Sequence, residues 1–314
     1  LYLKTTAITR DDNAYDALIA SERGKLSRPV QTATNAMGDT IHSIVYRRHP
    51  LGAKLRAADL DSMDYDKVIN LHRERFGDMG DFTFIVTGDF DTDSIRPLLE
   101  TYLASLPSTG RRERARDIGY GFFSGHGSFD YTHPMTDYPQ SITYSFFNGE
   151  CPYDLEHILR AQAFGQILKS RLLADIREAR GLTYGITTHC SVTAGFNGPD
   201  TPSRFILPVY IKVAPGHEAE CYEAVRSTVK ALCEEGPTAE ELAKVTAYLS
   251  KNIAENRRDN SYWDTVLKVY DQYGPDMDSG YEAIVDSLTP EAVRNFGARY
   301  VVPADHVEIT MRPE

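Results

Sequence analysis

The sequence has little cysteine and no long apolar run, and both shortages exclude classes of protein. Its 314 residues include four cysteines, none of which belongs to a C-x-x-C pair. A cysteine-based structural zinc site and a thioredoxin-like redox motif are therefore not expected. No segment approaches the roughly 20 apolar residues that a membrane-spanning helix needs. We interpret all four cysteines as buried or incidental thiols: Cys151, Cys190, Cys221 and Cys233.

Positive charge is also scarce in this sequence. Lysine and arginine number 34 against 45 aspartates and glutamates, which gives a formal net charge of −11 at pH 7. A surface of this sign repels phosphate backbones, so nucleic acid is not an expected partner. The length suggests about two domains, each able to bury a core of its own.

Helices and strands follow one another in an order typical of an α+β protein. In the first part of the chain, apolar spacing and capping residues predict helices at 11–26, 29–46, 64–76 and 91–102 and a strand at 82–87. In the second part they predict strands at 128–133, 141–147, 183–192, 204–213 and 306–311, and helices at 154–180 and 218–233 and from 238 and 289. We expect a mixed, largely antiparallel sheet with helices packed on one face.

The chain divides into two predicted domains and repeats itself between them. Residues 1–106 and 118–314 are joined by a linker at 107–117, which contains proline, glycine and four arginines. Residues 61–86 resemble residues 286–311, because each stretch has a capped helix, a polar loop and a strand. The second copy closes a unit that begins near residue 118, whereas the first closes a unit whose beginning is missing. The sequence thus predicts the end of one domain followed by a complete homologous one.

The stretch from Arg177 to Gly185 is the most informative part of the chain. A predicted helix carries Arg177, Gly181 ends that helix, and a strand begins near Tyr184. A guanidinium and a phenol hydroxyl are therefore expected near the same end of the sheet. Both are hydrogen-bond donors suited to a peptide carbonyl or a developing oxyanion.

Three short strings in this region resemble a family signature. They are S-R-L-L at 170–173, I-R-E at 176–178 and G-L-T-Y at 181–184, and they resemble metal-free domains of insulinase/pitrilysin zinc metallopeptidases, in particular the PqqL-like single-chain bacterial type. The earlier segment agrees, since H-P at 49–50, F-T-F-I-V-T-G-D-F-D at 82–91 and Y-L-A-S-L-P at 102–107 resemble the end of a preceding domain. The resemblance covers nearly the whole chain.

The resemblance implies four homologous α+β domains that form two lobes around a closed chamber. Zinc would be held in an absent N-terminal domain by an H-x-x-E-H motif and a distal Glu. An Arg and a Tyr of the last domain would contact the substrate beside the metal, and these correspond to Arg177 and Tyr184. The implied partners are the N-terminal lobe of the same polypeptide and a peptide substrate. A bacterial periplasm or cell-envelope location is implied as well, with the cytoplasm left open.

The chain departs from the complete enzyme because it contains no H-x-x-E-H. The nearest string, Y-D-L-E-H at 153–157, has Tyr153 in place of the first histidine. We therefore expect no cofactor in this chain and no hydrolysis by it alone; its expected role is to close the chamber and bind peptide in a zinc metalloendopeptidase. Two alternatives remain open: a non-catalytic binding or assembly subunit of the same fold, and an unrelated α+β ligand-binding domain.

Overall fold

The computed structural model describes residues 1–28, 32–134, 139–196, 198 and 200–314. The chain forms two compact units, one of Leu1–Pro29 with Lys54–Ala115 and one of Val30–Ala53 with Arg116–Glu314. Within the described part, no helix is both long enough and apolar enough to cross a membrane.

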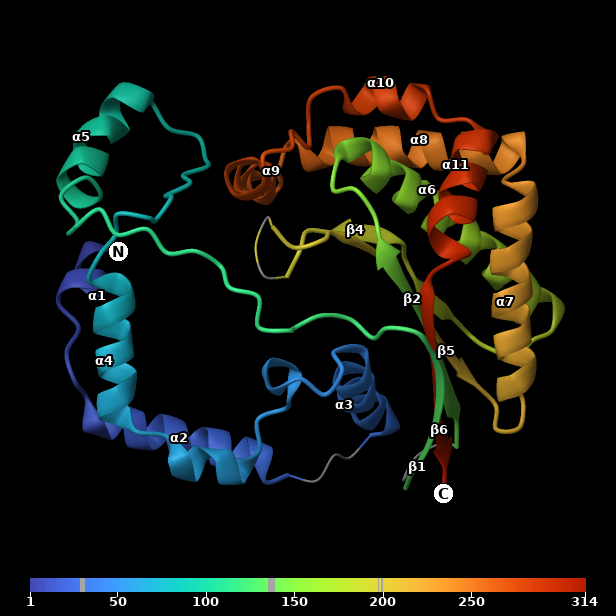
Figure 1. The fold of residues 1–314 in the computed structure, drawn as a ribbon, viewed down its shortest axis with the longest axis horizontal. Helices are drawn as coiled ribbons and strands as arrows, with labels where there is room; N and C mark the ends of the chain where they lie inside the picture. The colour runs from blue at the N-terminus through green and yellow to red at the C-terminus, as the bar shows by residue number, and fades with distance from the viewer. Residues whose placement is uncertain (29–31, 135–138, 197, 199) are drawn as a thin grey trace. The chain divides into compact units, whose positions relative to one another are not determined.

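The first unit is built from helices (Figure 1). Three of them begin where a side-chain carboxylate caps the first turn: Asp11, Asp64 and Asp91 each accept a hydrogen bond from a backbone N–H three residues later. The predicted helices at 11–26, 64–76 and 91–102 are thereby confirmed. The helices of this unit are α1 (Tyr2–Thr6), α2 (Asp12–Leu26), the 3₁₀-helix η2 (Ala57–Ser62), α4 (Tyr65–Phe76) and α5 (Thr92–Tyr102).

The strand predicted at 82–87 is wrong. These residues belong to no strand, and Phe82, Phe84 and Val86 are each about 40% exposed. A strand exists only when a neighbouring strand accepts and donates its ladder hydrogen bonds, and the described part of the first unit contains no other strand. The predicted equivalence of 61–86 and 286–311 fails for the same reason, because only the second copy ends in a strand.

The first residues of the segment predicted as a linker are bonded to the rest of the first unit. The Met79 N–H donates to the Pro107 carbonyl at 2.7 Å, Thr109 donates to the Asp78 carboxylate, and Arg75 pairs with Glu113 at 2.8 Å. No helix or strand is formed between residues 107 and 118. The domain boundaries at 106 and 118 stay predictions.

The second unit contains one six-stranded sheet, whose order is β1-β6-β2-β5-β3 with β4 also paired to β5. Only β1 and β6 run parallel, and every other pair is antiparallel. The α+β class with a mixed, largely antiparallel sheet is therefore confirmed. The strands are β1 (His126–His133), β2 (Ser141–Glu150), β3 (Ile186–Thr188), β4 (Ser191–Thr193), β5 (Arg204–Val213) and β6 (Asp305–Pro313).

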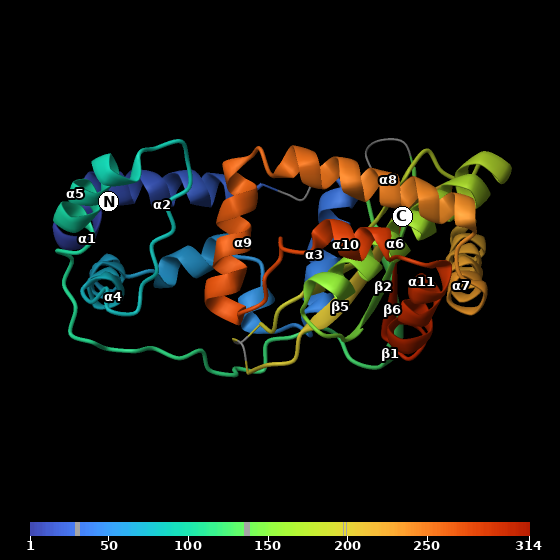
Figure 2. The same cartoon turned by 90° about the horizontal axis from the view of Figure 1, so that it is seen from above.

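A layer of helices covers one face of this sheet (Figures 1 and 2). Alternate residues of β5, from Phe205 to Ile211, point into this layer and are at most 1% exposed. The Thr238–Glu241 capping box opens α8 as predicted. The helices are α6 (Leu155–Leu172), the π-helix η3 (Leu173–Ala179), α7 (Glu218–Glu235), α8 (Ala239–Asn256), α9 (Asn260–Tyr273), α10 (Tyr281–Asp286), α11 (Pro290–Phe296) and the π-helix η4 (Gly297–Val301).

One helix from the first part of the sequence, α3 (Ala33–Val45), packs on the opposite face of the sheet (Figure 1). Its Met37 and Ile44 share a buried cluster with Ile142 of β2 and Ile309 of β6. The described helix has Thr32 as its N-cap, and the predicted start at Pro29 lies outside the described residues. Helices thus lie on both faces of the sheet, with most of them in the layer on one face and α3 on the other.

Two regions of the second unit differ from the predicted elements. The strand expected at 183–192 is two short strands, because the backbone at Cys190 approaches α6 so closely that a Cβ on Gly165 would stand 2.4 Å from the Cys190 nitrogen. Helices α9 and α10 were not predicted. All four cysteines are free and buried as expected, and burial raises the pKa of Cys151 and of Cys233 to about 12.

Candidate functional site

The junction between η3 and β3 is held in a fixed shape by backbone contacts. Ile176 anchors η3 in the core with no exposed surface, and its carbonyl accepts a hydrogen bond from the Leu182 N–H at 3.0 Å. Gly181 takes a φ of +66°, a left-handed conformation that favours glycine. The chain therefore reverses between helix and strand within a few residues, as the sequence indicates.

Tyr184 projects from this junction into solvent. The residue before it is buried: the Thr183 hydroxyl donates to the Lys212 carbonyl at 2.6 Å and accepts from the Gly185 N–H at 3.2 Å. Tyr184 itself is 95% exposed. The backbone next to Tyr184 is therefore fixed, while its phenol ring has almost no packing contacts. A tyrosine with a structural role usually packs its ring against other side chains.

Arg177 lies on the exposed side of η3. Its neighbour Arg180 is paired with Asp175 at 2.8 Å and with Glu220 at 3.2 Å. Within the described residues the Arg177 guanidinium makes no ion pair, and no hydrogen bond joins it to Tyr184. Both predicted residues thus present unengaged donors at one junction, while their contact with a substrate stays a prediction.

Arg171, from the S-R-L string, has a structural role that the sequence did not reveal. Its guanidinium binds the Glu241 carboxylate through two hydrogen bonds of 2.7 and 2.8 Å and donates to the Gly236 carbonyl at 2.9 Å. The Arg171 pairing is the main reason why the pKa of Glu241 falls to about 2. Arg171 therefore joins the end of α6 to the capped start of α8.

Replacing Arg171 by methionine is expected to lower the free energy of unfolding by roughly 2 kcal/mol, because it leaves a half-buried Glu241 carboxylate without its partner. Urea denaturation followed by circular dichroism measures the change. Arg180→Met is the matched control, since its pair with Asp175 is more exposed and is expected to contribute less than about 1 kcal/mol. Equal losses in the two variants would contradict this role for Arg171.

The Y-D-L-E-H string is the beginning of α6. Asp154 caps the helix, and its carboxylate lies 2.8 Å from the Nδ1 atom of His157. The Nε2 atom of His157 lies 3.0 Å from the Tyr300 hydroxyl, and Glu156 pairs with Arg160. Both ring nitrogens of His157 are therefore engaged within the protein.

The family resemblance implies zinc in another domain, and the described residues of this chain were compared with what a zinc site requires. Across the described ranges, no group of three or more His, Cys, Asp or Glu side chains is arranged to hold a metal ion. A zinc site needs at least three such protein ligands.

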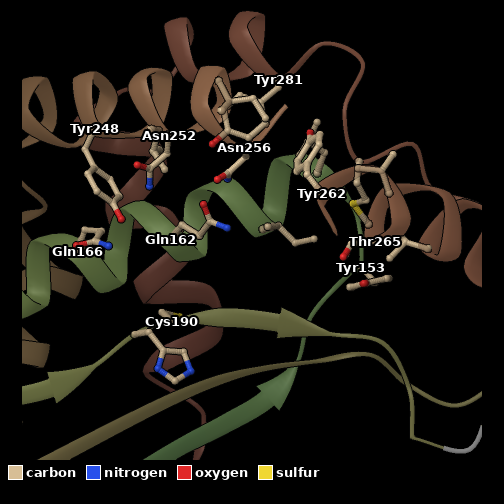
Figure 3. A pocket seen from close by; sticks show the side chains of 18 residues that line it. Tyr153, Gln162, Gln166, Cys190, Tyr248, Asn252, Asn256, Tyr262, Thr265 and Tyr281 are labelled. Atoms are coloured by element: carbon tan, nitrogen blue, oxygen red, sulfur yellow. The ribbon is translucent and has the colours of Figure 1, made fainter. Parts of the chain in front are cut away.

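A cavity that the sequence analysis missed lies between α6, α8 and α9 (Figure 3). Its volume is about 370 Å³, and 18 residues line it. Gln162 and Gln166 belong to α6, and Asn252 and Asn256 belong to α8. The signal in the sequence was a pair of amide side chains four residues apart on each of two helices, a spacing that places them on one helix face.

Known proteins resemble this chain in sequence and in fold. The family model described as the peptidase M16 inactive domain matches residues 62–249, which is more than half of the chain. The periplasmic protease PqqL from Escherichia coli superposes with a TM-score of 0.80 over 98% of the chain at 16% identity. A peptidase M16 inactive domain from Pseudomonas fluorescens superposes with a TM-score of 0.72 over 98% of the chain at 15% identity, and the match covers 72% of that chain.

The ferredoxin protease FusC, solved as a mutant in complex with Arabidopsis ferredoxin, gives a TM-score of 0.74 over 99% of the chain at 15% identity. The present chain spans about a third of the length of PqqL and of FusC, since each match covers 33% of the solved chain. A search of curated proteins found no match. At these identities the structural likeness concerns the fold.

Proposed function

The chain belongs to the family of the peptidase M16 inactive domain, and from that premise we propose that it closes the chamber of a two-lobed metallopeptidase and binds its peptide substrate. The family match supports a non-catalytic part of a peptidase-like protein. The proposal adds a second lobe of the same polypeptide, which holds the zinc, and assigns the substrate contacts to Arg177 and Tyr184.

The exposure of Tyr184 is the observation that carries this proposal. A tyrosine that is 95% exposed on a rigid backbone contributes little to folding, so its phenol hydroxyl is free to meet another molecule. The Arg177 guanidinium stands on the adjacent helix with no ion pair within the described residues. A peptide brought to this junction would meet one neutral and one cationic donor.

The chemistry of these two side chains suits the carbonyl of a bound peptide. A phenol O–H donates one hydrogen bond and stays neutral at pH 7, whereas a guanidinium offers a planar set of N–H donors that holds a carbonyl or carboxylate in a fixed orientation. Donors placed where negative charge develops stabilise the transition state more than the ground state. We assign Tyr184 to the developing oxyanion and Arg177 to the peptide backbone.

The apolar surface of the first unit supports the proposed second lobe. Among its described residues, the apolar side chains that are buried are Leu60, Met79 and Leu106, while large apolar side chains of α4, α5 and the 82–86 segment are exposed. A surface of this kind on a water-soluble chain marks an interaction site. We propose that the second lobe covers it; the exposed residues are Val68, Leu71, Phe82, Phe84, Val86 and Leu98.

A reconstitution assay tests the proposed function. Hydrolysis of a fluorogenic peptide is measured with this chain alone, with the zinc-bearing lobe alone, and with both together. We expect turnover only when both are present. Turnover by the chain alone would show that it is an enzyme in its own right, and full turnover by the other lobe alone would make it a binding or assembly subunit.

A further inference from the structure

The cavity between α6, α8 and α9 has the size of a ligand site and a defined set of walls (Figure 3). Its volume of about 370 Å³ lies within the range of about 300–1,000 Å³ that is usual for small-ligand pockets. Much of its lining is apolar, and the link between β3 and β4 contributes His189 and Cys190. The apolar part of the lining consists mainly of Leu155, Ile158, Val266, Val269 and Met277.

The polar part of the lining is made of neutral groups. None of the described residues that line it is Asp, Glu, Lys or Arg. Burial lowers the pKa of His189, so its imidazole is uncharged at neutral pH. A ligand with a formal charge would find no partner here, and an uncharged ligand is therefore favoured.

Four side-chain amides face the cavity without partners. Figure 3 shows Asn252 and Asn256 pointing from α8 toward α6, which carries Gln162 and Gln166. Within the described part of the chain, no hydrogen bond joins these four amides to another group. Each amide has a carbonyl that accepts and an NH₂ that donates, which is the same pair of functions that a peptide group presents.

The spacing of these amides matches an extended peptide. Residues four apart on a helix are separated by about 6 Å along its axis. Peptide groups on one edge of an extended chain repeat every two residues, which is about 6.6 Å. Two adjacent amides on one helix therefore meet two successive peptide groups on the same edge of such a chain.

The α8–α9 wall of the cavity is held rigidly. Arg257 follows α8 and binds Asp278 at 2.7 Å, and it also pairs with Glu282 at the start of α10. The Tyr262 hydroxyl donates to the same Asp278 carboxylate at 2.6 Å, which keeps its ring against the cavity. A preformed wall of this kind reduces the entropy that a ligand loses on binding.

We propose that this cavity binds a short, extended, uncharged peptide segment, whose backbone pairs with the amides of α6 and α8 and whose apolar side chains contact the apolar lining. The identification of this segment as part of a peptidase substrate rests on the proposed function. The proposal that the cavity binds a peptide does not depend on it. The site would hold a stretch of peptide other than the one that meets Arg177 and Tyr184, since neither of those residues lines the cavity.

The test uses the intact chain and a blocked tripeptide of leucine and valine as probe. Trp263 is the only tryptophan of the sequence, and its ring lies 5.3 Å from that of Tyr262 in the cavity wall, so its fluorescence reports binding. We expect saturable binding, weakened at least 10-fold in the double variant Gln162→Leu/Asn252→Leu. Gln272→Leu, an exposed amide of α9 outside the lining, is the matched control and keeps the affinity.

A second arm keeps the test decisive if the double variant does not fold. A probe with N-methylated peptide groups has the same apolar side chains but lacks the backbone donors, and it should bind the unaltered chain at least 10-fold more weakly. Equal affinity for the two probes, or no binding of either, overturns the proposal. Tyr184→Phe should leave binding unchanged, so that loss of turnover and loss of cavity binding are separate results.

Discussion

In the proposed two-lobed peptidase, Tyr184→Phe is expected to lower kcat by roughly 10- to 1,000-fold, the range found when one oxyanion donor is removed. The substitution deletes a hydroxyl and keeps the ring. Because Tyr184 is 95% exposed, the melting temperature should not change. Steady-state kinetics and thermal unfolding on the same preparation measure both quantities.

Tyr270→Phe is the matched control for this variant. Tyr270 is 62% exposed on α9 and belongs to neither the junction nor the cavity lining, so its hydroxyl should affect neither turnover nor stability. If the Tyr184 hydroxyl only supported the η3–β3 junction, the outcome would be reversed, with a lower melting temperature and normal turnover. Normal turnover in Tyr184→Phe would remove the catalytic assignment made here.

The second expected result is a loss of stability of about 3 kcal/mol between pH 7 and pH 4, caused by His306. Burial lowers the pKa of His306 to about 4, with smaller contributions from His126 and Arg226. Its ring stacks on Phe147 at 3.9 Å, and its Nε2 atom has no hydrogen-bond partner. Glu308 lies 3.9 Å from that atom, beyond hydrogen-bond range, and already binds Arg226, so it does not offset the burial.

The direction follows from proton binding. In the unfolded chain His306 binds a proton below the ordinary histidine pKa near 6.5. In the folded chain it binds one only below about pH 4. The free energy of unfolding therefore falls as the pH decreases across this window. Urea denaturation at several pH values measures the fall, and it should be largely absent in His306→Phe, which keeps the stacking and cannot titrate. An unchanged slope in that variant would contradict the assignment.

The loss due to His306 is distinguishable from that of the carboxylates. Glu241 has a pKa lowered to about 2 by Arg171, so its contribution to stability is complete above its ordinary pKa and is lost only as the pH falls toward 2. The His306 window lies above that of Glu241. Two separate steps in the stability profile are therefore expected.

Local signals in the sequence predicted much of this fold correctly. Asp64, Asp91 and Thr238 each mark a helix start, because a capping side chain acts within one turn and needs no distant partner. The strands β1, β2, β5 and β6 were recognisable from their apolar pattern. The signature from Ser170 to Tyr184 indicated both the family and the helix–strand junction.

Other features depended on groups far apart in the chain. The segment 82–87 has the composition of a strand but lacks a neighbour to complete its hydrogen bonds. The strand at 183–192 is interrupted where Gly165 of α6 meets Cys190, which the local sequence around 190 does not reveal. The amides of the cavity lie some 90 residues apart in the chain, on α6 and α8, and their common face exists only once these helices pack together.

The sequence by itself determined the family, the fold class and the helix caps, because these depend on residue type and short spacing. It also predicts Arg177 and Tyr184 as the substrate contacts. Only the tertiary structure decided that Tyr184 stands free in solvent, that Arg171 joins α6 to α8, and that four amides surround an uncharged cavity. The physical reason is that exposure, pairing and cavity shape are properties of surfaces that distant segments form together. A hydrogen bond or a buried contact needs both of its partners in place, and the chain order does not state which segments will meet.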